Sequence, residues 1–173
     1  GTVDPDGLPG VHSAAFDEIY VDALDIDYRR LAASQERAIR TLRSGEVRVT
    51  TPDGVDLRFE VGDRPFNRQD GDASKARMAD ARVRVDREIE LPAGVVRVAP
   101  LESTVRGVIV VPAARFGADK ATGIRLEIEQ GVVTRATATT GDAALQTFLK
   151  SAPGATRFRE LGLGFNPKLV APA

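Results

Sequence analysis

The chain has 173 residues, of which 42% are hydrophobic and 28% are charged, and its formal net charge is −1 at pH 7. This composition is typical of a globular protein with a sizeable core, and it argues against a nucleic-acid-binding protein, which would carry a basic excess. Cysteine is absent, which excludes disulfides and thiolate metal ligands, and no segment approaches the ~20 consecutive apolar residues of a membrane-spanning helix.

The first 24 residues are predicted to form an acidic, flexible arm. Residues 1–27 contain seven Asp and Glu residues and no Lys or Arg, and several Pro and Gly residues lie within the first ten positions. His12 falls in this arm without partners at a defined spacing, so we expect no catalytic role for it. The first residues lack the basic-then-apolar order of a signal peptide, and we therefore expect a cytoplasmic protein. A single domain is expected over residues 25–173.

An amphipathic helix is predicted from Asp27, whose side chain can cap it, to the helix-ending Gly45. Its apolar residues recur every three or four positions, and Gln35 is the one interruption of the stripe. A hairpin is expected next, because the alternating segments 47–50 and 55–61 flank a Pro-Asp-Gly turn.

Residues 62–74 form the longest polar loop, and apolar residues within the charged segment that follows indicate an extended run at 83–91. Further strands are predicted at 95–98, 105–111, 124–128 and 132–138. The segment 105–111 is nearly all apolar, which favours a central strand. A hairpin turn is expected at Gln130-Gly131, a second helix at 142–150, and a short helical turn through Phe158 and Leu161. Together these elements predict an α+β fold, with a mostly antiparallel sheet or partial barrel and two or three flanking helices.

Several segments match the motifs of one enzyme family in order and spacing. They are Val47–Leu57 with its Val-Arg-Val-Thr-Thr-Pro-Asp-Gly, Leu91–Pro100 with its Leu-Pro-Ala-Gly, the strands at 105–110 and 123–127, and Glu160–Pro167 with its Glu-Leu-Gly-Leu-Gly-Phe-Asn-Pro. Over roughly residues 25–170 the chain resembles the metal-dependent aminopeptidases of the thermophilic aminopeptidase T/S type.

The resemblance implies a dinuclear site of divalent metal, Zn or Co, at which a metal-bound water attacks the peptide bond beside a free N-terminus. Glu160 matches one family ligand, whereas Val95 stands where the family has its first ligand Glu. The remaining His, Tyr and Asp ligands lie beyond the Asn-Pro motif, where this chain has only residues 168–173, and the family's N-terminal α/β domain has no counterpart. The resemblance therefore implies an aminopeptidase-related domain that is inactive in this form. The family generally forms dimers, so a homodimer is expected.

Two explanations of the incomplete ligand set stay open: the chain is a piece of a longer aminopeptidase-like protein, or it is a pseudoenzyme that serves as a binding or oligomerisation module. In the second case the polar loop 62–74 is the candidate contact for a peptide or small molecule, through Asn67, Arg68, Gln69, Asp70, Asp72 and Ser74. A purely structural or solvated loop is the alternative. Glu160 also has a second interpretation, in which it is a surface carboxylate that pairs with Arg157 or Arg159 and binds no metal. Neither nucleic acid nor a membrane is expected as a partner.

Overall fold

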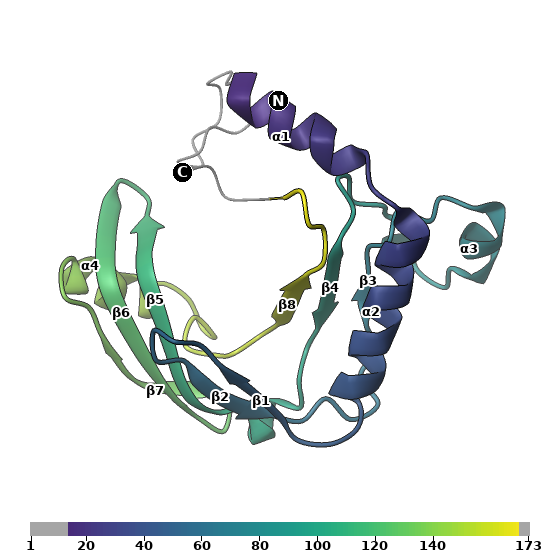
Figure 1. The fold of residues 1–173 in the computed structure, drawn as a ribbon. Coiled ribbons are helices and arrows are strands. Elements are labelled where there is room, and N and C mark those ends of the chain that lie inside the picture. Colours follow the sequence, from purple (N-terminus) through teal and green to yellow (C-terminus); the bar gives the residue numbers. More distant parts are fainter. Residues whose placement is uncertain (1–13, 170–173) are drawn as a thin grey trace. The chain divides into compact units, whose positions relative to one another are not determined.

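The computed structural model describes residues 14–169, and it has the expected α+β class (Figure 1). Its helices are α1 (Ala14–Leu24), α2 (Tyr28–Leu42), α3 (Lys75–Asp80) and α4 (Asp142–Leu149), with short 3-10 helices at Arg84–Arg87 and Glu102–Thr104. Its strands are β1 (Val47–Thr50), β2 (Asp56–Phe59), β3 (Asn67–Arg68), β4 (Val95–Val98), β5 (Arg106–Phe116), β6 (Asp119–Glu129), β7 (Val132–Thr137) and β8 (Leu161–Gly164). The strands form one five-stranded and one three-stranded sheet, neither of which closes into a barrel.

The described residues fall into two compact units. Unit 1 contains residues 14–40, 66–97 and 162–169, and unit 2 contains residues 41–65 and 98–161. No helix among residues 14–169 combines the length and the apolar character that crossing a membrane requires.

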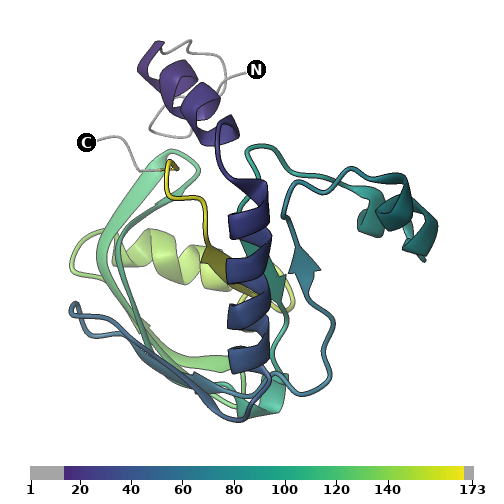
Figure 2. The same cartoon turned by 45° about the vertical axis from the view of Figure 1, so that its right-hand side comes forward.

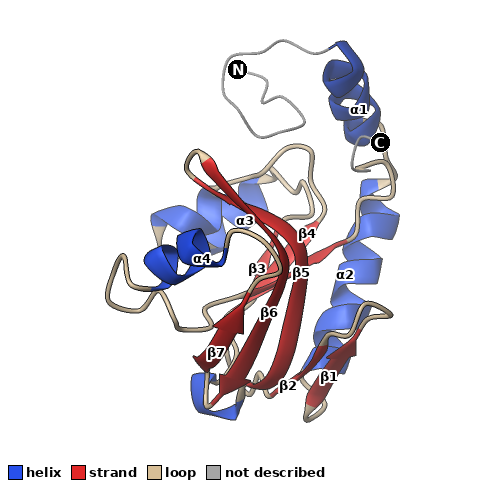
Figure 3. Cartoon of the chain, turned by 90° about the vertical axis from the view of Figure 1, so that its left-hand side faces the viewer, coloured by secondary structure: helices blue, strands red, loops and turns tan. Residues whose placement is uncertain are grey.

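Unit 2 is built on an antiparallel sheet with the strand order β1-β2-β5-β6-β7 (Figure 3). The expected central position of the 105–111 segment is confirmed, since β5 lies in the middle of this order. The turn at Gln130-Gly131 is confirmed too, and both residues have positive φ, 49° and 74°, as a two-residue hairpin turn requires. β5 and β6 extend well beyond the predicted strands, because Gly117, with φ of 66°, allows a second tight hairpin between them.

One hydrophobic cluster of unit 2 lies between this sheet and α4. Ala121 and Ile124 of β6 and Leu145 of α4 are buried, and half-buried apolar residues of β5, β6 and β7 pack around them. The ring centroids of Phe116 and Phe148 lie 4.9 Å apart. α4 has only eight residues, so it covers a limited part of the sheet.

Unit 1 places α2 against the small sheet β3-β4-β8 (Figure 2). The predicted helix start is confirmed, because Asp27 Oδ1 accepts a hydrogen bond of 3.0 Å from the Arg30 backbone N–H. Leu31 and Gln35 on the inner side of α2 are buried, as is Val96 of β4.

Two local expectations were wrong. Within the predicted arm, residues 14–24 form α1, whose Ala23 is fully buried. His12 lies outside the described residues. The extended run at 83–91 is interrupted by the 3-10 helix Arg84–Arg87, where the Asp86 carboxylate accepts from the backbone N–H groups of Arg82 and Val83. Leu161, expected in a helical turn, instead begins β8.

Candidate functional site

The two family motifs that lie far apart in the sequence meet in unit 1. The Leu-Pro-Ala-Gly segment leads into β4, the Leu-Gly-Leu-Gly segment forms β8, and these strands are neighbours in the small sheet. Just beyond the strands, the Phe165 backbone N–H donates to the Gly94 carbonyl over 2.6 Å. The sequence predicted neither the pairing nor its partners.

The side chain of Asn166 connects these segments through hydrogen bonds. Its side chain is buried, and its Nδ2 donates hydrogen bonds of 2.9 Å to the backbone carbonyls of both Ala23 and Ala93. Its Oδ1 accepts from the Lys168 backbone N–H at 3.0 Å. Gly94 makes room for this arrangement, because a Cβ there would lie 2.6 Å from the Asn166 Cβ, and its φ of 143° suits glycine. The Asn of the Asn-Pro motif is therefore a structural residue that connects α1, the segment before β4 and the segment after β8.

The two positions matched to family metal ligands do not supply a metal site. Val95 is the first residue of β4 and has no donor atom in its side chain. Glu160 directly precedes β8, is exposed, and is not without an interaction partner. Its expected partner Arg157 instead forms an ion pair of 2.7 Å with Glu102. Among residues 14–169, no three His, Cys, Asp or Glu side chains gather in a way that could hold a metal ion. The donor set described here does not fit the dinuclear centre that the family implies.

The carboxylate of Asp70 is the centre of the predicted ligand loop. Its side chain is 3% exposed, and it accepts from Arg68 Nε at 2.9 Å and from a terminal nitrogen of Arg77 at 3.0 Å. The backbone N–H of Asp72 donates to it as well, at 3.0 Å. Arg68 also reaches Glu36 of α2, at 3.2 Å. Both carboxylate oxygens of Asp70 thus accept hydrogen bonds within unit 1, and the two arginines offset the cost of removing its negative charge from water.

Asp72 and Ser74 shape the end of the same loop. Asp72 Oδ1 accepts from the Ser74 backbone N–H at 2.8 Å, and hydrogen bonds from Ser74 hold the pKa of the Asp72 carboxyl below its usual value. The Ser74 hydroxyl in turn accepts from the Arg77 backbone N–H at 3.2 Å, as an N-cap. These two side chains turn the chain into α3.

Gln69 joins the loop to the rest of unit 1 through both its backbone and its side chain. Its backbone N–H donates to Val95 O at 2.9 Å, and its carbonyl accepts from Gly94 N at 2.8 Å and from Gln35 Nε2 at 3.1 Å. Its side-chain Nε2 donates to Asn67 Oδ1 at 2.9 Å, and its Oε1 accepts from the Glu90 backbone N–H at 3.0 Å. The loop residues singled out from the sequence are therefore brought together, and their contacts within the chain are those of a folded structural element.

Gln35 is a residue whose role sequence reasoning missed. It was noted only as an interruption of the apolar stripe of α2, yet it is fully buried and connects α2 to the Gln69 carbonyl. A long polar side chain on the inner face of a helix was the available signal, because such a group must find a hydrogen-bond partner when it is buried.

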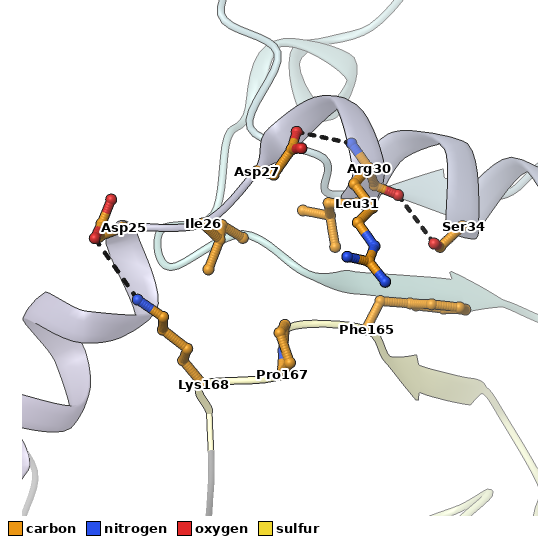
Figure 4. Close-up of a pocket in the computed structure, with 9 residues that line it drawn as sticks. All are labelled: Asp25, Ile26, Asp27, Arg30, Leu31, Ser34, Phe165, Pro167 and Lys168. Atoms are coloured by element: carbon orange, nitrogen blue, oxygen red, sulfur yellow. Dashed lines mark hydrogen bonds and ion pairs between the residues drawn. The ribbon is translucent and has the colours of Figure 1, made fainter.

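A pocket in unit 1 lies beside the start of α2 (Figure 4). Its volume is about 480 Å³, and it is lined by Asp25, Ile26, Asp27, Arg30, Leu31, Ser34, Phe165, Pro167 and Lys168. Most of its wall is apolar. Lys168 Nζ lies 3.7 Å from Asp25 Oδ2, and Asp27 caps α2. The pocket adjoins the Asn-Pro motif, but its two carboxylates lack a third metal ligand among the described residues.

Comparison with known protein families identifies the class of protein to which the chain belongs. Residues 22–171 match the family model of the thermophilic metalloproteases, M29. The chain belongs to this metallopeptidase family, in agreement with the resemblance found in its motifs.

Solved structures show the same fold. AmpT from Thermus thermophilus matches with a TM-score of 0.59 and 23% identity, over 85% of this chain and 36% of that one. A 2,5-dihydroxypyridine dioxygenase from Pseudomonas putida KT2440 matches with a TM-score of 0.63 and 19% identity, over 94% of this chain and 50% of that one. The chain thus spans between about a third and a half of the length of these two proteins. The search of curated proteins gave no match.

Proposed function

We propose that this chain is an aminopeptidase-related domain that does not hydrolyse peptides in this form. The observation that carries the proposal is the donor set: Val95 occupies a ligand position on β4, Glu160 is exposed, and the described residues contain no group of three ligating side chains. A dinuclear site needs several carboxylates and imidazoles to hold two cations at a short, fixed separation. One carboxylate alone binds a divalent cation weakly.

Family membership supports the peptidase relationship, while fold likeness by itself does not select a reaction. The two solved structures with this fold have names that denote different chemistry, AmpT and a dioxygenase. Function depends on the site that a fold carries, and the M29 match is what favours a peptidase ancestry here.

The test is a release assay with the purified chain. The chain is incubated with Zn²⁺ or Co²⁺ and an N-terminally free leucyl peptide, and free leucine is measured. The matched control is Glu160→Gln, which keeps the size of the side chain and removes its charge. We expect the two proteins to release leucine at the same background rate. A rate that depends on added metal and falls in the Glu160→Gln variant would contradict the proposal.

The alternative is a non-catalytic binding or oligomerisation module that uses the 62–74 loop. What supports it is the ordered arrangement of the loop on α2 and β4, through Arg68, Gln69 and Asp70. Sedimentation over a range of micromolar concentrations tests the proposed homodimer. A concentration-dependent dimer that Arg68→Ala weakens would favour this module, and a monomer throughout would contradict it.

A further inference from the structure

An apolar groove lies on unit 2, between the sheet, α4 and the segment that precedes β8. Its volume is about 390 Å³, and Ile109 of β5, Leu126 of β6, Val133 of β7, Leu145 of α4 and Phe158 contribute to its wall. Figure 3 shows α4 beside the strands of this sheet. No residue of the 62–74 loop lines this groove.

The groove exists because the sheet is longer than the helix that covers it. β5 and β6 have eleven residues each, whereas α4 has eight. Leu145 packs on Ala121 and Ile124 at one end of the core and is buried there, while Ile109 and Leu126 remain half-buried. Partly covered apolar surface of this kind gains stability when a ligand removes it from water.

Among the charged residues that line the groove, one arginine is not neutralised by a carboxylate. Arg157, Arg159 and Glu160 contribute to the lining there. Arg157 is paired with Glu102 at 2.7 Å, and Glu160 is not without an interaction partner. Arg159 has no carboxylate partner among residues 14–169. The groove therefore combines an apolar wall with an uncompensated guanidinium.

We propose that this groove binds an alkyl carboxylate of medium chain length. The tail lies along the apolar wall, and the carboxylate accepts two hydrogen bonds from Arg159, a pairing that the planar guanidinium favours. Small-molecule pockets span about 300–1,000 Å³ and combine apolar walls with few polar groups, a description that this groove fits. A carboxylate is favoured over a phosphate because the nearby Glu160 repels a second negative charge more strongly. The proposal is independent of the proposed loss of hydrolysis.

Calorimetric titration of the full chain with decanoate, below its micellar concentration, tests the proposal. We expect one site, with affinity falling about fourfold for each methylene removed from the tail in octanoate and hexanoate. Decylammonium and decanol have the same tail, and we expect both to bind at least tenfold more weakly, because Arg159 repels the first and makes only a neutral contact with the second.

Arg159→Gln and Arg135→Gln separate the groove from general charge. Both remove one exposed arginine of unit 2, but Arg135 does not line the groove. We expect Arg159→Gln to lose at least tenfold in affinity for decanoate, and Arg135→Gln to bind as the unmodified chain does. Ala155→Phe fills the groove from its wall and is expected to abolish binding while a thermal melt confirms the fold.

Several results would overturn the proposal. They are the absence of binding heat, equal losses in the two arginine variants, equal affinity for decanoate and decanol, and decanoate-induced methyl shifts in NMR spectra that avoid Ile109, Leu126 and Val133. A concentration-dependent dimer that buries these methyl groups without any ligand would also overturn it, since the occupant would then be a second copy of the chain.

Discussion

Replacing Asn166 with alanine removes the donor for two buried backbone carbonyls at once. Nδ2 of Asn166 donates to Ala23 O and Ala93 O, each over 2.9 Å, and both alanines are fully buried. Leaving a buried carbonyl unsatisfied costs about 1–3 kcal/mol, so Asn166→Ala is expected to lower the free energy of unfolding by about 2–6 kcal/mol. That is a large part of the ~5–15 kcal/mol that stabilises a typical domain.

The isosteric variant Asn166→Asp tests whether hydrogen-bond donation is the cause. It preserves the side-chain volume and an acceptor for the Lys168 N–H, but it places a carboxylate oxygen against the two carbonyls. We expect a loss at least as large as that of Asn166→Ala. The matched control is Asn67→Asp, because the structure uses Asn67 as an acceptor, for Gln69 Nε2 at 2.9 Å.

Urea unfolding followed by circular dichroism measures these differences. We expect lower transition midpoints for both Asn166 variants with an unchanged m-value, and a change within about 0.5 kcal/mol for Asn67→Asp. A loss in Asn166→Asp no larger than that in Asn67→Asp would refute the role assigned to the Asn166 donor.

Three further predictions concern unit 1. Asp70→Asn removes the negative charge that pairs with both Arg68 and Arg77. We expect the free energy of unfolding in urea to fall by about 1–3 kcal/mol, a range that allows for the partly exposed arginines. The control Asp80→Asn changes an exposed side chain and should leave the free energy of unfolding nearly unchanged. Gly94→Ala places a Cβ 2.6 Å from the Asn166 Cβ at a φ of 143°, and we expect a melting temperature clearly below that of Gly162→Ala, where no atom lies within 4 Å of the added Cβ. Backbone N–H groups of Arg82 and Val83 lower the pKa of Asp86 from its ordinary 3.8. The ionised Asp86 therefore stabilises the fold above about pH 4, and this stabilisation is lost as the pH falls through the lowered pKa. We expect the free energy of unfolding of an Asp86→Asn variant to fall less steeply between pH 5 and pH 2 than that of the unmodified chain. The same pH dependence in both proteins would contradict this prediction.

The sequence predicted the elements whose signals are local. The apolar stripe of α2, the Asp27 cap and the Gln130-Gly131 turn are each decided within a few residues, and all three are confirmed. The extended run predicted at 83–91 was wrong, because the Asp86 side chain accepts hydrogen bonds from the backbone of Arg82 and Val83 and favours a 3-10 turn there.

Long-range contacts set the limit of prediction for the site. Asn166 forms its hydrogen bonds with residues that lie 73 and 143 positions away in the sequence. Gln35 donates to the Gln69 carbonyl, which lies 34 positions away. No pattern among neighbouring residues predicts either contact. The loop 62–74 was recognised as polar and distinctive, but the sequence did not show that Asp70 would be buried between two arginines. The M29 relationship, by contrast, was visible in the motifs and is confirmed.

The central claim is that this chain does not assemble the metal centre of its family. The most direct measurement is the metal content of the purified chain after equilibrium dialysis against Zn²⁺ and Co²⁺, determined by elemental mass spectrometry beside the Glu160→Gln variant. The account predicts the same background content in both proteins. One or two equivalents of metal that remain bound to the unmodified chain and are lost in Glu160→Gln would contradict it.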